Sequence, residues 1–461
     1  MDNVSNNMDR RKFIKLVGAG AAFAALSGCG SKEGSSAKQG SEPAGEMTYR
    51  VDPKNGNRLS LLGYGCMRFP RLPKSQDLAT ENNLDQEAIN KSIDYAIERG
   101  VNYFDTSPLY CKGFSEKATG IALSRHPRDK YFIATKMSNR NQHTSREASL
   151  AMYKRSFEDL KTDYIDYYLV HNVGTFEAMK ERYIDNGIMD FLLEERESGR
   201  IRNLGWSFHG DGEFFDYMAL KYKWDFVMIQ LNYFDWDIID WDKNAGARRT
   251  NVSAKHQYDL LTKNNIPIVI MEPLLGGRLA KPHYKARAAM TQLNPDASAA
   301  SWAFRFAGSF PNVLTVLSGM TFMEHLKDNL RTYSPLVPLN ESERDMLVKV
   351  SQVMLEYRNI NCTECQYCMP CPYGLDIPEI IAHYNRCLNE GNFPDDKQSE
   401  DYKRARRAFL VGLDRKVDPL RQANRCTSCR KCVPNCPQSI NIPQEMQRID
   451  RFVENLKTDI V

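Results

Sequence analysis

Nine of the twelve cysteines lie in the last hundred residues, and eight of the nine form two tight clusters. The later cluster has the spacing Cys426-x2-Cys429-x2-Cys432-x3-Cys436-Pro437. In such a run three thiolates ligate one [4Fe-4S] cubane and the fourth thiolate reaches a second cubane. The clustering therefore indicates a metal module rather than scattered disulfide bonds.

The earlier cluster, Cys362-x2-Cys365-x2-Cys368-x2-Cys371-Pro372, is one residue shorter before its last cysteine. Both clusters end in Cys-Pro and are followed by Ile-Pro, at Ile377-Pro378 and Ile442-Pro443, which indicates an internal duplication. We therefore expect two [4Fe-4S] clusters with crossed ligands. The first set would be Cys362, Cys365, Cys368 and Cys436, and the second Cys426, Cys429, Cys432 and Cys371. Zinc is the alternative, although four evenly spaced cysteines per block exceed what one tetrahedral ion uses.

A second set of reactive side chains accompanies apolar runs in the first half of the chain: Asp105, Tyr110, Lys136 and His171. A cation near a phenol lowers the phenol's pKa from about 10, a carboxylate holds the cation, and an imidazole orients a carbonyl oxygen. On one rim, these four groups would make a proton-donor set. Each has a purely structural alternative, such as a helix cap for Asp105 or a solvated strand end for Lys136.

Short β-branched or aromatic runs alternate with longer stretches of helical spacing from Met47 onward. The expected strands are residues 59–66, 103–106, 131–135, 165–170, 201–206, 226–231, 266–271 and 313–317. The expected helices between them include residues 86–99, 145–160, 190–198, 297–306 and 322–330. Eight repeats over about 280 residues predict a (β/α)8 TIM barrel, whose chemistry gathers at the carboxyl ends of its strands. No strand-Gly-x-Gly-x-x-Gly-helix element appears, which disfavours a Rossmann fold.

The cysteine-rich tail has helical spacing around its cysteine blocks, at residues 342–357, 378–390, 402–413 and 443–456. The fold class is thus α/β, a TIM barrel with a C-terminal α-helical, ferredoxin-like iron–sulfur domain. One helical turn, Lys403-Arg404-Ala405-Arg406-Arg407, is strongly positive. A solvated face is the usual explanation, and nearby anionic clusters or an acidic electron-transfer partner are the functional alternatives.

The first residues have the pattern of a signal peptide, with a basic pair, an apolar stretch and small residues up to Cys29. The segment Arg10-Arg11-Lys12-Phe13-Ile14-Lys15 resembles a twin-arginine export motif, and Leu26-Ser27-Gly28-Cys29 resembles a lipobox with a lipidated cysteine. We expect a protein exported to the periplasmic side and anchored to the membrane through a lipid on Cys29. The alternative is an ordinary amphipathic helix with a chance arginine pair.

Composition limits the remaining possibilities. The 461 residues include 62 Lys plus Arg and 58 Asp plus Glu, and a net charge of +4 does not suggest a nucleic-acid binder. No run of 18 apolar residues occurs, which excludes a polytopic membrane protein. The expected organisation is a signal peptide at 1–29, a tether at 30–46, the barrel at 47–336 and the iron–sulfur domain at 340–461.

Residues 47–332 resemble the aldo/keto reductase family. The segments that carry the resemblance are Leu62–Arg68, Phe104–Tyr110, Ala134–Lys136 and Asp166–His171. The resemblance implies that the catalytic residues are Asp105, Tyr110, Lys136 and His171. It also implies an NAD(P) site with contacts at Ser207, Gln230, Gly319 and Asn329. The tail resembles a dicluster ferredoxin domain appended to one bacterial branch of this family.

The sequence departs from the family pattern where the nucleotide would be held. Met271 stands where many members stack a tyrosine under the nicotinamide. Gly319 and His325 stand where NADP-preferring members tend to place lysine and arginine, so we expect NAD(H) to bind at least as well as NADP(H). Arg278 is the next candidate for a 2′-phosphate contact.

The expected function is that of an oxidoreductase that reduces a carbonyl or oxidises an alcohol on a small-molecule substrate with NAD(P). A cubane passes single electrons whereas nicotinamide moves a hydride, so coupling would need a flavin or a redox partner protein. No flavin motif is visible. The alternatives are a membrane-tethered electron-transfer protein whose barrel is a docking scaffold, and a barrel stabilised by purely structural clusters.

Overall fold

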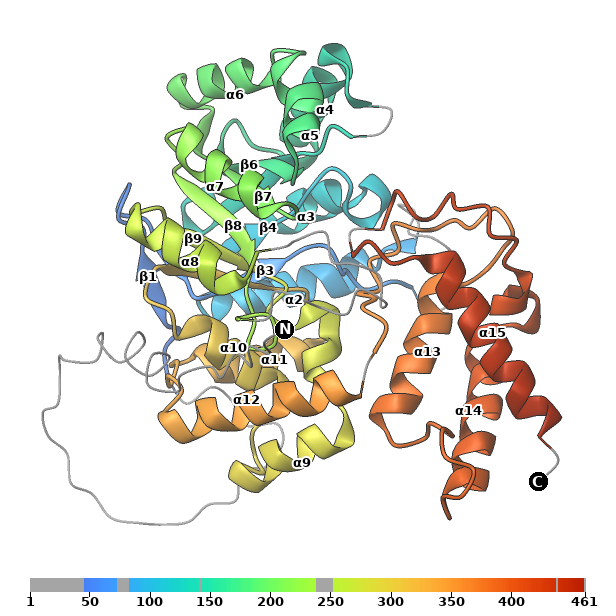
Figure 1. Ribbon diagram of the computed structural model, residues 1–461. Helices are drawn as coiled ribbons and strands as arrows, with labels where there is room; N and C mark the ends of the chain where they lie inside the picture. Colours follow the sequence, from blue (N-terminus) through green and yellow to red (C-terminus); the bar gives the residue numbers. More distant parts are fainter. Residues whose placement is uncertain are drawn as a thin grey trace, which may run out of the picture.

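The computed structural model describes residues 45–72, 83–140, 143–237, 252–357, 359–436 and 438–459. Eight parallel strands close into a barrel in the order β10-β3-β4-β5-β6-β7-β8-β9 (Figure 1). Their bounds are β3 Leu62–Gly65, β4 Tyr103–Asp105, β5 Phe132–Met137, β6 Ile165–Val173, β7 Ile201–Phe208, β8 Phe226–Gln230, β9 Ile268–Met271 and β10 Val313–Ser318. The predicted TIM barrel is confirmed, with each barrel strand inside or overlapping an expected run.

The first expected strand is divided in two. Residues Arg58–Ser60 form β2, which pairs antiparallel with β1, Tyr49–Val51, and only Leu62–Gly65 enters the barrel. The turn between β1 and β2 closes the amino end of the barrel, because the Tyr167 hydroxyl inside it donates to Asp52 and accepts from Asn57. The opposite end, where the strands terminate, stays available for chemistry.

Helices surround the barrel (Figure 1). They are α2 Gln86–Glu98, α3 Ser115–Leu123, α4 Arg146–Leu160, α5 Phe176–Met179, α6 Ile188–Glu197, α7 Gly212–Lys221, α8 Ala254–Lys263, α9 Tyr284–Leu293, α10 Ala299–Gly308 and α11 Met323–Tyr333. Several of these helices are capped by a residue whose side chain accepts a hydrogen bond from a backbone N–H of the first turn. These residues are Asp85, Ser145, Asp211, Ser253 and Ser298. Such caps satisfy amide groups that have no partner within the helix.

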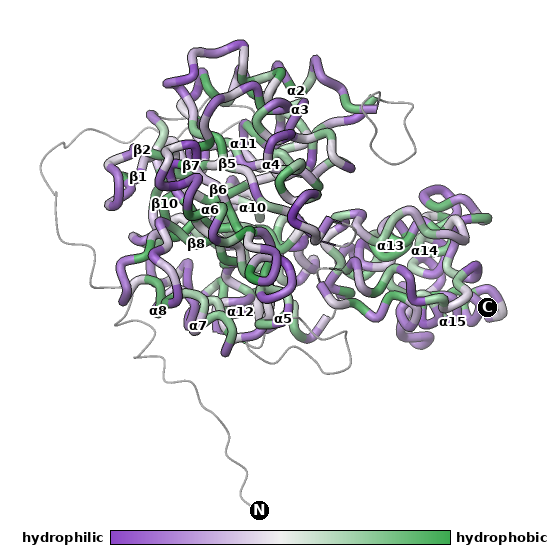
Figure 2. Tube along the Cα trace, turned by 90° about the horizontal axis from the view of Figure 1, so that it is seen from above, coloured by the Kyte–Doolittle hydropathy of each residue, from purple (hydrophilic) through white to green (hydrophobic). Residues whose placement is uncertain are grey.

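Apolar side chains form one core inside the barrel and a larger core between strands and helices. The inner core includes Tyr103, Tyr167 and Phe226, all fully buried. The outer core contains the buried Trp206 and Trp302. Burying one large apolar side chain contributes about 1.5–3 kcal/mol, so these layers hold the strand ends in fixed positions. Figure 2 shows apolar stretches concentrated within the barrel and among the C-terminal helices.

Helix α12, Glu341–Glu356, belongs to the barrel although the sequence pattern assigned it to the iron–sulfur domain. Leu347 and Val350 are buried in the same core as the barrel helices, and α12 packs along α9. A bidentate ion pair between Arg305 and Glu343 fixes its first turn. The boundary between the two cores therefore lies after α12 rather than before it.

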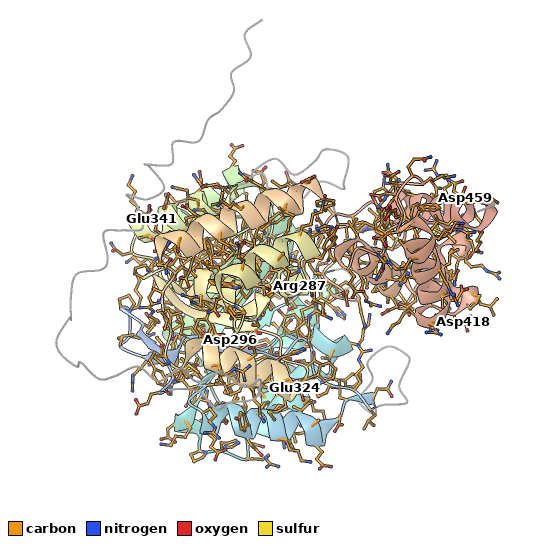
Figure 3. The ribbon with its side chains drawn as sticks, turned by 90° about the horizontal axis from the view of Figure 1, so that it is seen from below. Arg287, Asp296, Glu324, Glu341, Asp418 and Asp459 are labelled. Atoms are coloured by element: carbon orange, nitrogen blue, oxygen red, sulfur yellow. The ribbon has the colours of Figure 1, made fainter. Side chains whose placement is uncertain are left out.

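The remaining tail forms a separate lobe of three helices beside the barrel, α13 Ile377–Asn389, α14 Tyr402–Lys416 and α15 Ile442–Thr458 (Figures 1 and 3). In Figure 3, Asp418 and Asp459 mark this lobe, and Glu341 and Arg287 mark the barrel side. The core of the C-terminal lobe contains the buried Phe409. In the same core Phe393 stacks on Phe452, with 4.7 Å between the ring centroids.

Some basic side chains of the first turns of α14 make hydrogen bonds and ion pairs within the lobe. Arg406 donates to the backbone oxygens of Leu456 and Asp459, and Arg404 pairs with Asp401.

Among the described residues, none of the helices has both the length and the hydropathy that a membrane-spanning segment needs. The expected signal peptide and the tether up to residue 44 lie outside the described residues.

Candidate active site

The four expected proton-transfer residues come from three neighbouring strands of the barrel. Asp105 ends β4, Lys136 lies in β5, and His171 lies in β6, while Tyr110 follows β4 in the short 3-10 helix Tyr110–Gly113. The strands β4, β5 and β6 are adjacent and parallel. The barrel therefore brings all four side chains to one side of its carboxyl rim.

Lys136 and Asp105 form a buried ion pair. The Lys136 Nζ lies 2.7 and 2.6 Å from the two carboxylate oxygens and 2.7 Å from the Thr106 carbonyl oxygen. The two side chains are only 1% and 3% exposed. Burial lowers the pKa of Lys136, and the Asp105 carboxylate opposes that shift. The ammonium is thus held in a fixed position beside Tyr110, with its Nζ 5.0 Å from the ring centroid.

Tyr110 differs from the sequence expectation in its acidity. Burial raises the pKa of Tyr110 well above its ordinary value, and the Asp105 carboxylate raises it further. The expected lowering by Lys136 does not dominate because the Asp105 carboxylate neutralises that ammonium and itself raises the pKa of the phenol. In this arrangement Tyr110 is a protonated phenol, suited to donate a hydrogen bond or a proton.

His171 is held by a chain of hydroxyl groups. Its Nδ1 lies 2.5 Å from Ser138 Oγ, which lies 2.9 Å from Ser107 Oγ. Burial lowers the pKa of His171 well below its ordinary value, and the nearby Lys136 adds to the effect. The imidazole is therefore neutral, and its ring meets that of Tyr110 edge-on with 6.2 Å between centroids.

Sequence reasoning missed Ser138 and Tyr367. Ser138 follows Lys136 by two residues, and the period of a strand turns both side chains to the same face, so a signal was available. Tyr367 lies between two cysteines of the first block, and its ring stands 4.8 Å from the Arg140 guanidinium above the rim. Only docking of the tail brings Tyr367 there.

The expected nucleotide contacts lie along the opposite side of the rim. Ser207, Gln230 and Asn329 are all buried. Ser207 Oγ accepts the Asn172 N–H at 2.8 Å, Gln230 Nε2 donates to Glu272 at 2.8 Å, and Asn329 Nδ2 donates to Ser318 Oγ at 2.9 Å. Gly319 packs against the side chain of Arg68.

The first cysteine block lies across this nucleotide side of the rim. Gly276 packs so closely on Thr363 that a Cβ at this position would clash with the Thr363 side chain, and Arg278 donates to Asn361 at 2.7 Å. Gln438, just after the second block, donates to Glu272 at 3.3 Å. The tail thus packs on the loop after β9 and shares the acceptor Glu272 with Gln230, one of the expected nucleotide contacts.

One cysteine of the second block lies with three cysteines of the first block. Cys362, Cys365 and Cys368 of the first block line one cavity together with Cys436 of the second block. Burial raises the pKa of the Cys368 thiol, and the charges of the other three raise it further. In the same way, burial raises the pKa of Cys432 to about 11, and Cys426, Cys429 and Cys371 contribute.

The two blocks also share an unusual backbone. The residues two after the first cysteine, Glu364 and Ser428, have φ of 52° and 58°. The residues after the second cysteine, Gln366 and Arg430, have φ of 64° and 62°. Left-handed conformations at non-glycine residues are uncommon, so their repetition at matching positions supports the inferred duplication.

Among the described residues, the cysteines do not form a site for a single metal ion. Within the described ranges, no group of three or more His, Cys, Asp or Glu side chains is arranged to hold one metal ion. Ligands of a [4Fe-4S] cubane bind different iron atoms and stand farther apart than the ligands of one zinc ion.

Family comparisons agree with this division into barrel and tail. The profile of the aldo/keto reductase family matches residues 61–352. The chain belongs to the aldo/keto reductase family. A 4Fe-4S dicluster domain matches residues 361–442, so this aldo/keto reductase carries an iron–sulfur domain at its C-terminal end.

Curated relatives match part of the chain. The oxidoreductase YqkF of Bacillus subtilis is 30% identical over 286 residues, 59% of this aldo/keto reductase and 87% of YqkF. The aldo-keto reductase YhdN of the same organism is 31% identical over 135 residues, which are 25% of this chain and 41% of YhdN.

Solved structures support the fold. The holo form of aldo-keto reductase AKR11C1 from Bacillus halodurans superposes with a TM-score of 0.52 at 23% identity, covering 66% of this chain and 96% of that protein. At this identity the likeness concerns the fold alone. Together, the family, the barrel and the appended domain identify an oxidoreductase.

Proposed function

We propose that this oxidoreductase interconverts a carbonyl and an alcohol at the barrel mouth, with Tyr110 as the proton donor to the carbonyl oxygen. The observation that carries the proposal is the convergence of Tyr110, the buried Lys136–Asp105 pair and the neutral His171 on one rim. A protonated phenol beside a fixed ammonium can protonate an alkoxide and then recover its proton from solvent. In the reverse reaction Tyr110 would accept the alcohol proton.

The neighbouring residues would orient the substrate. We assign the Ser138 hydroxyl as the donor to His171 Nδ1, which leaves Nε2–H facing the substrate oxygen. Lys136 would stabilise negative charge on the phenol as its proton leaves, and Asp105 holds Lys136 in place. These groups are preorganised, so they need no rearrangement during the reaction.

NAD(P) is the hydride donor that membership of the family implies, and it would supply a hydride to the carbonyl carbon. We propose Ser207, Gln230, Gly319 and Asn329 as its contacts, reached after the tail segment over Gly276 moves. Gly319 offers no cation to a 2′-phosphate. Burial lowers the pKa of His325 and keeps it neutral near physiological pH, which also favours NAD(H).

For the iron–sulfur domain we propose two [4Fe-4S] clusters. One would be ligated by Cys362, Cys365, Cys368 and Cys436, and the other by Cys371, Cys426, Cys429 and Cys432. Cys429 is exposed, so the second cluster would exchange electrons with a redox partner protein at the surface.

We also propose export by the twin-arginine route with a lipid anchor on Cys29, on the sequence motifs alone. A cubane must be assembled under reducing conditions in the cytoplasm, and twin-arginine export carries folded proteins. Replacing Arg10 and Arg11 by lysine should leave the iron-containing protein in the cytoplasm, as fractionation would show. Normal export of that variant would refute the route.

Tyr110→Phe tests the catalytic proposal. Turnover of a panel of carbonyl compounds with NAD(P)H should fall about 10²- to 10⁴-fold, the scale of one lost general acid. Nucleotide affinity should stay close to that of the wild type, because only the phenol oxygen is removed. Wild-type turnover by this variant would exclude Tyr110 as the donor.

A further inference from the structure

A cavity of about 460 Å³ lies between the barrel mouth and the first cysteine block. Its barrel side is formed by Tyr110 and by loop residues 67–72, and its tail side by Glu364–Tyr367, which includes Cys365. A volume of this size suits one small molecule. The proposed proton donor and a proposed cluster ligand therefore face the same space.

The barrel holds the cysteine block against this cavity. Arg68 donates to the Thr363 carbonyl oxygen, Arg71 to Gln366 Oε1 at 2.8 Å, and Lys112 to the Met369 carbonyl oxygen at 2.8 Å. Three side chains from two barrel loops thus tie down the segment that carries Cys365. The cavity therefore lies between two parts of the chain that are held together by specific hydrogen bonds.

The lining favours an aromatic ligand that gains negative charge. Phe69, Leu109 and Phe322 offer apolar surface, and Phe322 is 59% exposed at the opening. Arg68, Arg71 and Lys112 line the cavity together with one acidic residue, Glu364, so cations outnumber carboxylates there. The backbone carbonyl oxygens that Arg68 and Lys112 contact do not neutralise their charges. Fixed cations beside an acceptor stabilise the charge that it takes up with an electron.

We propose that Cys365 is the point at which electrons leave the iron–sulfur domain for a quinone bound in this cavity, with Tyr110 as one proton donor. This inference rests on the proton-donating role of Tyr110 and the cluster ligation by Cys365 proposed above. The proposal adds a reduction that requires no nicotinamide. Because a quinone can accept single electrons, the one-electron clusters need not be coupled to hydride transfer.

The chemistry of the acceptor follows from the electron source. Iron–sulfur clusters have reduction potentials between about −700 and +450 mV, a range in which an isolated ketone does not accept a single electron. A quinone does, because the added electron is shared between two conjugated oxygens. One quinone would take two electrons, and two reduced clusters would supply one electron each. It also takes two protons, one from the Tyr110 hydroxyl and one from water, and leaves as the hydroquinone.

The clusters must then be reduced again. The reductant is a low-potential one-electron carrier protein, acting at the exposed Cys429 side of the domain. In the overall reaction two molecules of that carrier are oxidised for each quinone reduced, and Tyr110 recovers its proton from solvent.

The test uses anaerobic holoprotein reduced with dithionite and then freed of dithionite by desalting. Mixing with 1,4-naphthoquinone-2-sulfonate should restore the cluster absorbance rapidly. Leu109→Trp, which fills the cavity, should slow this reoxidation about tenfold or more by displacing the probe. Val348→Trp, at an exposed position on α12, is the matched control and should behave like the wild type.

Ferricyanide separates loss of the cavity from damage to the clusters. This small oxidant takes electrons at the protein surface, so Leu109→Trp should leave its reaction unchanged. Equal quinone rates in Leu109→Trp and wild type would overturn the proposal, as would an equal slowing with both oxidants. These rates are measured without nucleotide, so they are independent of the NAD(P)H-dependent turnover that tests the proposed carbonyl chemistry.

A redox-inert analogue provides a second readout. Naphthalene-2-sulfonate should shift the electron paramagnetic resonance spectrum of the reduced wild-type protein, because it binds beside Cys365. The shift should be absent in Leu109→Trp. An unchanged spectrum in the wild type at saturating analogue would contradict the assigned position of the ligand.

Discussion

Gln438 of the iron–sulfur domain donates a hydrogen bond to the carboxylate of Glu272 at the barrel mouth, with 3.3 Å between Nε2 and Oε1. The same carboxylate accepts from Gln230, an expected contact of the nicotinamide. A residue of the tail and a residue of the nucleotide site therefore share one acceptor. This arrangement links docking of the tail to the state of the nucleotide site.

Replacing Gln438 by leucine should increase the affinity for NAD(H). The variant loses a hydrogen bond to a charged group, worth about 1.5–3 kcal/mol, and the tail is held less firmly over the site. Calorimetric titration should show a Kd lower by about tenfold or more. Gln447→Leu, which removes a bond to Ser428 within the tail, is the matched control. An unchanged Kd in Gln438→Leu would mean that this contact does not limit nucleotide access.

Nucleotide preference is a second prediction. We expect NAD(H) to bind at least as tightly as NADP(H), because neither Gly319 nor the neutral His325 offers a charge-assisted bond to a 2′-phosphate. Arg278, the next candidate from the sequence, donates to Asn361 of the tail. Parallel titrations with both nucleotides check the point. Binding of NADP(H) tighter by about tenfold or more would refute it.

Glu116 predicts a dependence of stability on pH. Its carboxyl is 3% exposed and accepts from the hydroxyls of Thr135 and Ser156. Burial raises the pKa of Glu116 from 4.5 to about 7. The folded state therefore binds more protons than the unfolded state between these values, and the free energy of unfolding falls as pH rises from 4.5 to 7.

Glu116→Gln should remove that dependence. At pH 8 the variant should be more stable than wild type by an amount on the order of 3 kcal/mol, and near pH 4.5 the two should differ little. Thermal unfolding followed by circular dichroism across this range is the measurement. Glu98→Gln, at an exposed position on α2, serves as the control. Parallel stability curves for Glu116→Gln and wild type would contradict the assigned titration.

If each cluster is ligated by cysteines of both blocks, the ligation predicts which cysteine variants lose the same cluster. Cys436→Ser should lose the same cluster as Cys365→Ser, because both thiols line one cavity. Cys371→Ser should instead resemble Cys429→Ser. Each variant should retain roughly four of about eight irons, and the spectrum of the remaining cluster should sort the four proteins into these two pairs. Pairing of Cys436→Ser with Cys429→Ser would show ligation within each block.

Much of this protein was readable from local pattern. Strand alternation and helical spacing predicted the eight barrel strands, because buried faces impose short periods on a sequence. Asp105, Lys136 and His171 could be placed on one rim because parallel barrel strands end at the same side. The cysteine spacing predicted an iron–sulfur module because ligands to one cubane must come from a short loop.

Tertiary structure decided the rest. Docking of Thr363 on Gly276, and of Gln438 on Glu272, depends on surfaces that lie far apart in the sequence. The high pKa of Tyr110 depends on burial, which no spacing reveals. Helix α12 belongs to the barrel because its apolar face packs against α9 rather than against the tail. Pattern identified the reactive groups, whereas long-range packing determined that Tyr110 and Cys365 share one cavity.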